Sequence, residues 1–401
     1  MPPSRPNFFA GLTRNTFLLA AGSFFADVST EMLYPILPIF LTQTLHANGT
    51  IVGLIEGVAQ ATQSIVQGIS GTLADRLRRH KAIAMTGFVA AALAKPLIGL
   101  ATIWQGVLGA RLLDRIGTGT RSAPRDALVA ESVAESNRGR AFGLEGFGDN
   151  AGAFCGPLVA LALLFWLQVG LRTIFYLAVV PGLLAFAMVA LVRERPAAVG
   201  TEPKKIARLK AFPSSYWKYL LITTIFGLGN SSNSFLILQT RDIGASLPLT
   251  IGIYAAFNLT AALISYPAGS LSDRWGRRNL LLAAFIVFAL SYLGFALTRN
   301  VAVIGLAFAG YGLFQGMFRA VGKAFATDFA PAGLRASAIG WYNTVVGFLG
   351  LFASVIAGEL WDHLGHAAVF YYGVASAAAG CVALIAILPA GQAGHRRRPP
   401  E

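Results

Sequence analysis

Charged side chains are scarce in this 401-residue chain, where Asp, Glu, Lys and Arg together make up only 12% of the residues. Soluble domains carry about a quarter, so the composition argues against a soluble enzyme. Cysteine is rarer still, and both Cys155 and Cys381 lie inside apolar runs, which argues against a disulfide framework or a zinc cluster. The sequence also has no nucleotide-binding loop, no metal-ligand cluster and no paired nucleophile and base. We therefore expect no enzymatic activity, no metal and no cofactor.

Apolar residues dominate instead, at 55% of the chain, together with 44 glycines. Glycine is commoner in membrane helices than in soluble ones. A formal net charge of +14 would indicate nucleic acid in a soluble protein. Here the basic residues lie in short segments between apolar runs, so membrane topology accounts for them and no nucleic-acid partner is expected. The sequence predicts an all-α integral membrane protein that contacts lipid.

The apolar runs are long enough to cross a bilayer. A hydrocarbon core of about 30 Å needs about 20 apolar residues as a helix, and a helix satisfies its own backbone hydrogen bonds there. The predicted twelve spans are residues 17–44, 50–74, 82–103, 105–126, 140–165, 171–192, 216–240, 249–272, 279–298, 301–325, 336–360 and 367–389.

The distribution of basic residues predicts the orientation. If both termini are cytoplasmic, most of the 32 Lys and Arg residues fall on the cytoplasmic side, and only Arg172, Arg241 and Arg299 fall on the other. The positive-inside rule favours this arrangement. We therefore expect both termini in the cytoplasm and a location in the plasma membrane, which in a bacterium is the inner membrane.

The chain divides into two halves. Residues 193–215 carry prolines and a run of charges and predict a cytoplasmic linker between bundles at residues 1–192 and 216–390. Residues 391–401 predict a basic cytoplasmic tail. The halves also repeat: the segment from Gly71 through Asp75 and Arg76 returns as Gly269, Asp273 and Arg274, and Arg121 returns as Arg319 with the same displacement. Parallel repeats of this kind are typical of one large class of transporters.

With this repeat the chain resembles the major facilitator superfamily (MFS) over essentially its whole length. The family motif between the second and third helices, Gly-x-x-x-Asp-Arg-x-Gly-Arg-Arg, is complete in the second half, whereas Arg78 replaces the inner glycine in the first. The resemblance implies an MFS fold of twelve transmembrane helices in two six-helix bundles, alternating access, and the drug/proton antiporter branch. We predict a gate formed by Gly71, Asp75, Arg76, Gly269, Asp273, Arg274 and Arg277; the alternative is that these charges only set topology.

Ionisable residues within the predicted spans concentrate in the first half. Such residues are costly within a membrane and are usually functional. Asp27 and Glu31 lie one helical turn apart, and low dielectric disfavours ionising both, which suits them to carry protons. Our hypothesis makes Arg111 or Arg115 their counter-charge, since the resemblance places the first and fourth helices around the cavity. The alternative is a static ion pair. Further members of this predicted proton-coupling set are Asp114, Glu145 and Asp149.

The acids at 145 and 149 have no assigned partner in the sequence. Lys95 and Arg115 are candidates, and a second proton relay is the alternative. The same helix contains Gly152, Gly156 and Pro157, which resemble the Gly-x-x-x-Gly-Pro signature of antiporters in the family. Small residues at this spacing permit close helix packing and proline bends the helix; an ordinary packing seam is the other interpretation.

The spans of the second half carry amides and aromatic residues in place of charges. A cavity with aromatic walls and sparse amides suits an amphipathic organic solute, whereas interfacial anchoring or helix packing is the alternative for each residue. The predicted cavity residues are Asn230, Asn233, Tyr254, Tyr311, Gln315, Trp341 and Asn343.

Together these features favour a monomeric secondary active transporter that exports a small amphipathic molecule or drug in exchange for protons, with Na⁺ an open alternative as the coupling ion. A second hypothesis is uptake of an organic anion or metabolite by proton symport, with Lys95, Arg111 and Arg115 binding the anion. A third is a non-transporting membrane receptor, against which the intramembrane charges argue.

Overall fold

Helices make up nearly all of the described chain, because a backbone in hydrocarbon must satisfy its polar groups internally. The structure is a computed structural model that describes residues 11–77, 79–134, 137–194, 212–329 and 335–388. No strand occurs among these residues. The predicted linker lies largely outside them, at 195–211, and the predicted tail at 391–401 lies wholly outside them.

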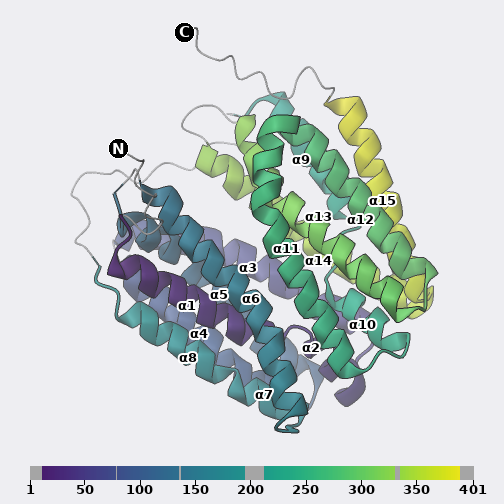
Figure 1. Ribbon diagram of the computed structural model, residues 1–401, viewed down its shortest axis with the longest axis horizontal. Coiled ribbons are helices and arrows are strands. Elements are labelled where there is room, and N and C mark those ends of the chain that lie inside the picture. The colour runs from purple at the N-terminus through teal and green to yellow at the C-terminus, as the bar shows by residue number, and fades with distance from the viewer. Residues whose placement is uncertain (1–10, 78, 135–136, 195–211, 330–334, 389–401) are drawn as a thin grey trace, which may run out of the picture.

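The first half runs from α1 to α8 and the second from α9 to α15 (Figure 1). The elements of the first half are α1 (Arg14–Glu31), α2 (Leu37–Ile39), the π-helix η1 (Phe40–Thr44), α3 (Gly49–Leu77), α4 (His80–Leu100), α5 (Trp104–Glu131), α6 (Arg138–Phe165), α7 (Leu171–Leu177) and α8 (Val179–Ala190). Those of the second half are α9 (Ser214–Gly227), α10 (Ser234–Asp242), α11 (Leu247–Trp275), α12 (Arg277–Leu297), α13 (Val301–Asp328), α14 (Arg335–His363) and α15 (His366–Ile387).

These helices agree with the predicted spans to within a few residues at each end. Twelve crossings result when α1 to η1, α7 with α8, and α9 with α10 are each counted as one. Among the described residues, eight helices are long and apolar enough to span a membrane by length and composition. The all-α membrane fold expected from the sequence is confirmed.

Three of these crossings are interrupted, and for two of them the sequence shows a local cause. Pro35 and Pro38 follow α1, and proline cannot continue a helix because it lacks the N–H donor; Pro38 sits in the first turn of α2 instead. Between α9 and α10 the non-helical segment 228–233 contains two asparagines and two serines. Irregular backbone at membrane depth is tolerated where it lines a cavity, and this segment does so.

The two halves touch chiefly through α3 against α14 and α6 against α11. Glycines make the first contact close: a Cβ on Gly53 would lie 2.0 Å from the carbonyl oxygen of Ser354, and one on Gly358 would lie 2.6 Å from that of Gly49. These residues belong to the ends of α3 and α14 that are remote from the chain termini. Toward the termini the halves diverge (Figure 1). The molecule is therefore closed at the end remote from its termini, called the far end below.

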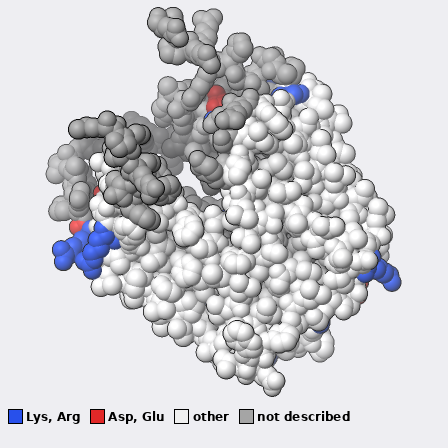
Figure 2. All heavy atoms as spheres, viewed as in Figure 1, with Lys and Arg blue, Asp and Glu red and all other residues white. Residues whose placement is uncertain are grey.

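The surface is compatible with a lipid environment. On the face in Figure 2, Lys, Arg, Asp and Glu appear only near the margins, and a broad uncharged area separates them. Large apolar side chains point outward from this surface, among them Leu263, Leu290 and Leu306, each more than 60% exposed. In water such exposure would be unfavourable, whereas lipid solvates it.

Candidate functional site

A cavity of about 390 Å³ lies between the two halves at the middle of the bundle. It opens among α1, α3, the α9–α10 break, α11, α13 and α14, and its volume is in the range of small-molecule sites. Among the described residues, three acidic or basic side chains line it: Glu31, Glu56 and Arg319. Its other polar lining residues are Tyr34, Gln60, Thr223, Asn230, Ser231, Ser232, Asn233, Tyr254, Asn258, Tyr311, Gln315 and Ser354.

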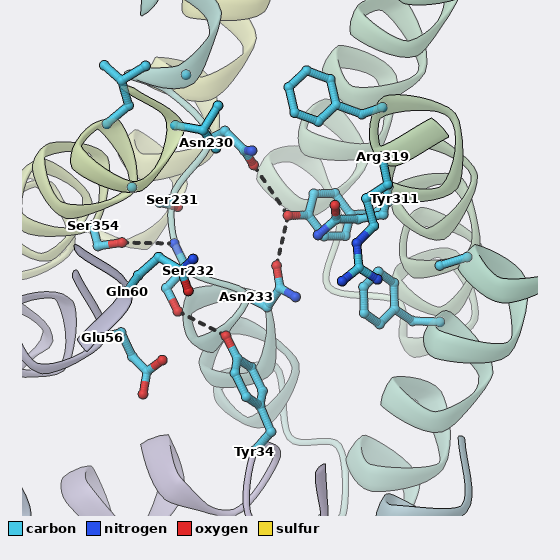
Figure 3. A pocket seen from close by; sticks show the side chains of 18 of the residues that line it. Tyr34, Glu56, Gln60, Asn230, Ser231, Ser232, Asn233, Tyr311, Arg319 and Ser354 are labelled. Carbon is cyan, nitrogen blue, oxygen red and sulfur yellow. Dashed lines mark hydrogen bonds between the residues drawn. The ribbon is translucent and has the colours of Figure 1, made fainter. Parts of the chain in front are cut away.

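The α9–α10 break supplies one wall of the cavity. The Tyr311 hydroxyl on α13 donates to Asn233 Oδ1 at 2.8 Å and approaches Asn230 Oδ1 at 3.4 Å (Figure 3). The backbone N–H of Ser232 donates to the Ser354 hydroxyl at 3.2 Å. These bonds fix the non-helical segment and leave the amide nitrogens of both asparagines as donors toward the cavity.

Glu31 connects the halves across the cavity. Its Oε2 accepts a hydrogen bond of 3.0 Å from the Tyr254 hydroxyl on α11. The rings of Tyr34 and Tyr254 stack with centroids 5.5 Å apart. This stack holds the Tyr254 ring, and with it the hydroxyl that contacts Glu31, in place. A carboxylate of the first half is thus bonded directly to a side chain of the second.

Asp27 lies one turn away from Glu31 and outside the cavity lining. Its nearest guanidinium is that of Arg121, at 3.9 Å, and the Asp27 side chain is 28% exposed. The hypothesis had assigned this counter-charge to Arg111 or Arg115. The structure places Arg121 beside Asp27, and α5 places Arg111 and Arg115 beside other carboxylates, from where both interact electrostatically with Glu31.

Those carboxylates form a buried ion cluster around Asp114. Lys95 Nζ lies 2.8 Å from Asp114, Arg111 lies 3.0 Å from it and Arg115 lies 3.2 Å from it. Arg111 also donates two hydrogen bonds of 3.2 Å to Glu56. Asp114 is fully buried, and a buried charge is tolerated only when it is paired in this way.

Arg125 holds the acids of α6. Its guanidinium lies 2.8 Å from Glu145 and 3.4 Å from Asp149, and it also donates to Ser23 on α1 at 2.9 Å. The predicted partners, Lys95 and Arg115, are wrong because both are committed to Asp114. The predicted span ends at residue 126, whereas α5 continues to Glu131 and holds Arg125 inside the bundle.

The glycines of α6 form the seam that receives α1. A Cβ on Gly152 would lie 2.9 Å from the Cβ of Asp27, and a Cβ on Gly156 would lie 2.9 Å from that of Glu31. Pro157 lies inside the same helix. The α6 motif therefore determines how closely the two acids of α1 approach α6.

The predicted gate is only partly described. The side chains of Asp75, Asp273 and Arg274, together with Gly269, lie outside the described side chains. A Cβ on Gly71 would lie 3.0 Å from that of Ala123 on α5, and Arg76 is exposed. Arg277 forms an ion pair of 2.7 Å with Asp328 at the end of α13, which ties the α11–α12 connection to α13.

Five of the predicted cavity residues line the cavity, and two do not. The five are Asn230, Asn233, Tyr254, Tyr311 and Gln315. Trp341 packs against the aromatic core of the second half, and Asn343 is absent from the lining, which on α14 begins at Val346. Position along α14 explains this difference, since both residues lie nearer the terminal end of the helix.

Several lining residues escaped the sequence analysis, among them Tyr34, Gln60 and Arg319. Tyr34 follows the break after α1, and a proline-flanked tyrosine within a span is a weak signal. Arg319 had been counted among the cytoplasmic charges. Its repeat partner Arg121 is buried, and that symmetry was the available sign that Arg319 lies at membrane depth.

Two similar six-helix halves, a central cavity between them and carboxylates at membrane depth define a membrane transporter rather than an enzyme. A model of the Major Facilitator Superfamily matches residues 19–238 and 219–401. The chain belongs to the major facilitator superfamily.

Curated relatives and solved structures support this assignment. An uncharacterised MFS-type transporter of Methanocaldococcus jannaschii is 33% identical over 368 residues, covering 90% of this chain and 92% of the relative. A probable 4-methylmuconolactone transporter of Cupriavidus pinatubonensis is 25% identical, covering 88% and 85%. The multidrug resistance protein MdtG of Enterobacter lignolyticus is 28% identical, covering 73% and 72%. The crystal structure of the nucleoside transporter NupG shares the fold, with a TM-score of 0.76 at 14% identity, covering 94% of this chain and 98% of that one.

Proposed function

We propose that this transporter couples proton movement to movement of a small amphipathic organic molecule, and that it exports the molecule in exchange for protons. Glu31 and Asp27 are the proposed proton carriers, and both termini are proposed to be cytoplasmic. In that orientation the far end of the bundle is periplasmic in a bacterium, and the observed state is closed to the periplasm.

The hydrogen bond between Glu31 and Tyr254 carries the proposal. Adding a proton to Glu31 removes a negative charge from the cavity lining and, at the same time, changes a bond that joins the two halves. Hydrogen bonds to charged groups contribute about 1.5–3 kcal/mol, so protonation weakens this link measurably. Proton binding and the relative movement of the halves are thereby coupled at one side chain.

Asp27 is the proposed second station for the proton. It lies one turn nearer the terminal end than Glu31, and Arg121 at 3.9 Å is close enough to stabilise its ionised form by charge without a direct hydrogen bond. The remaining acids, Asp114, Glu145 and Asp149, hold cations at 3.4 Å or less and serve as fixed structural charges in this proposal.

The gate residues close the terminal end in the opposite state of this proposal. They are Gly71, Asp75, Arg76, Gly269, Asp273, Arg274 and Arg277. The ion pair between Arg277 and Asp328 supports such a role for the second copy, since it joins the motif to the end of α13.

A pH gradient imposed on vesicles that contain the purified protein tests the coupling, with Nile red, a neutral fluorescent amphipath, as the probe. We expect the gradient to drive Nile red accumulation in the wild type, and we expect Glu31→Gln to abolish it while leaving the protein folded. Asp242→Asn at the far end is the matched control and should behave as wild type. Gradient-driven accumulation that persists in both Glu31→Gln and Asp27→Asn would reject the proposal.

The direction of transport has a second candidate, uptake by proton symport. Arg319 in the cavity lining favours an anionic cargo, and one relative is named as a 4-methylmuconolactone transporter. Relatives named MdtG, a multidrug resistance protein, favour export. Inside-out vesicles with an acidic interior separate the two, because an exchanger concentrates the probe inside them and a symporter expels it.

A further inference from the structure

Arg319 on α13 is the one cation that lines the cavity, and among the described residues it has no hydrogen-bond or ion-pair partner. Other cations within the spans are engaged: Lys95, Arg111 and Arg125 each lie within 3.0 Å of a carboxylate. The Arg319 side chain is exposed, and Figure 3 shows it reaching into the cavity beside Tyr311. An exposed, unpaired guanidinium at membrane depth is costly and marks a functional site.

Neither carboxylate of the cavity forms a hydrogen bond or an ion pair with Arg319. Glu56 is held by two hydrogen bonds from Arg111. Glu31 accepts its bond from Tyr254 and interacts with Arg319 only electrostatically, without direct contact. The N–H groups of the Arg319 guanidinium are therefore without an acceptor among the described residues.

The surroundings of Arg319 are suited to a molecule with one charged group and an apolar body. Gln315, one turn away, and the asparagines of the α9–α10 break supply neutral hydrogen-bond donors and acceptors, and Phe257 and Phe318 supply ring faces. A guanidinium presents two parallel N–H groups, which match the two oxygens of a carboxylate.

We propose that Arg319 binds the carboxylate of the transported molecule, whose apolar body lies against the aromatic wall of the second half. This inference rests on the proposed transport function and specifies its substrate class as small amphipathic carboxylates. The anion site is thus in the second half. Lys95, Arg111 and Arg115, which the sequence favoured for an anion, are held by Asp114 and Glu56 and have no comparable freedom.

Three probes of nearly equal shape isolate the charge: benzoate, benzamide and benzamidinium. Their binding to the purified wild-type protein in detergent is measured by calorimetric titration without a pH gradient. We expect benzoate to bind at least about tenfold more tightly than benzamide, which corresponds to one charge-assisted hydrogen bond, and benzamidinium to bind most weakly. Equal affinities, or no binding of benzoate up to 20-fold the concentration at which benzamide saturates, would overturn the inference.

Variants assign the effect to the residue. Arg319→Gln should weaken benzoate binding about tenfold and leave benzamide binding unchanged. Arg319→Lys should give an intermediate affinity for benzoate, because lysine keeps the positive charge but lacks the two parallel N–H groups of the guanidinium. Lys218→Gln removes the same charge from an exposed position on α9 outside the cavity and should bind as wild type. If Arg319→Gln does not fold, the lysine variant decides alone. An unchanged preference for benzoate over benzamide in either folded variant of Arg319 contradicts the proposal.

The outcomes separate this inference from the proposed function. Benzoate binding is measured at equilibrium, so it does not depend on proton coupling. Loss of coupling in Glu31→Gln with intact benzoate preference supports both statements. Coupled transport of the neutral probe Nile red with no benzoate preference retains the proposed function and rejects the substrate class.

Discussion

Asp362 at the end of α14 caps the first turn of α3 in the opposite half of the molecule. Its Oδ2 accepts hydrogen bonds of 2.7 Å from both the backbone N–H and the hydroxyl of Thr50, and its Oδ1 accepts one of 2.8 Å from the N–H of Gly49. The first N–H groups of a helix have no partner within the helix, and a carboxylate there also complements the helix dipole. The cap exists only while the far end is closed.

Asp362→Ala should therefore shift the transporter toward opening at the far end. Removing a helix cap costs about 1 kcal/mol, which changes the ratio of closed to open states about fivefold. Spin labels at the exposed positions Leu167 and Leu364, one in each half, report the separation by pulsed electron resonance. Asp242→Ala is the control, because Asp242 bonds only His366 within its own half; identical distance distributions in both variants would argue against the gate.

Asp114→Asn should destabilise the first half strongly. The substitution leaves Lys95, Arg111 and Arg115 around a neutral amide, and breaking a buried ion pair costs about 3–5 kcal/mol. The midpoint of thermal unfolding in detergent measures the loss. Asp126→Asn is the control, since Asp126 is 44% exposed beside Arg125 and an exposed pair contributes about 1 kcal/mol or less. Equal midpoints for the two variants would show that the cluster is not a stabilising unit.

Gly156→Ala should displace α1 from α6 at Glu31. The new Cβ would lie 2.9 Å from the backbone nitrogen of Met32 and the carbonyl oxygen of Val28, and backbone cannot yield as a side chain can. We expect a loss of about 1–3 kcal/mol of stability and reduced gradient-driven transport. Gly146→Ala on the same helix meets nothing within 4 Å and should be neutral or slightly stabilising. If Gly156→Ala behaves like Gly146→Ala, the seam has no positioning role.

Tyr254→Phe should distinguish the contribution of the hydrogen bond between the two halves from that of the proton-carrying carboxylate of Glu31. It removes the hydroxyl that bonds Glu31 and leaves the carboxylate and the ring stack in place. We expect transport driven by a pH gradient to persist with an altered rate, whereas Glu31→Gln abolishes it. The comparison is made by Nile red flux at a fixed gradient, with Tyr371→Phe on the exposed surface of α15 as the control. Complete loss of coupling in Tyr254→Phe would move the essential group from the carboxylate to the hydroxyl.

Much of the fold followed from local pattern. Runs of apolar residues separated by basic loops predicted all twelve crossings, because lipid imposes the same requirement on every segment. The continuation of α5 from residue 126 to Glu131 was not predicted. Arg121 and Arg125 lie beside carboxylates of α1 and α6, and that compensation comes from segments distant in the sequence.

For the candidate site, the sequence predicted many of the residues that take part but not how they pair with one another. The sequence by itself identified the acids of the proton-coupling set, including two on α1 one turn apart, because helical periodicity is a local property. The tertiary structure alone decided which cation meets which acid: Arg121 lies beside Asp27, three cations surround Asp114, and Arg319 has no ion-pair partner among the described residues. Ion pairing in low dielectric depends on separations of a few ångströms between helices, and those separations are set by glycine seams and by the packing of the two halves.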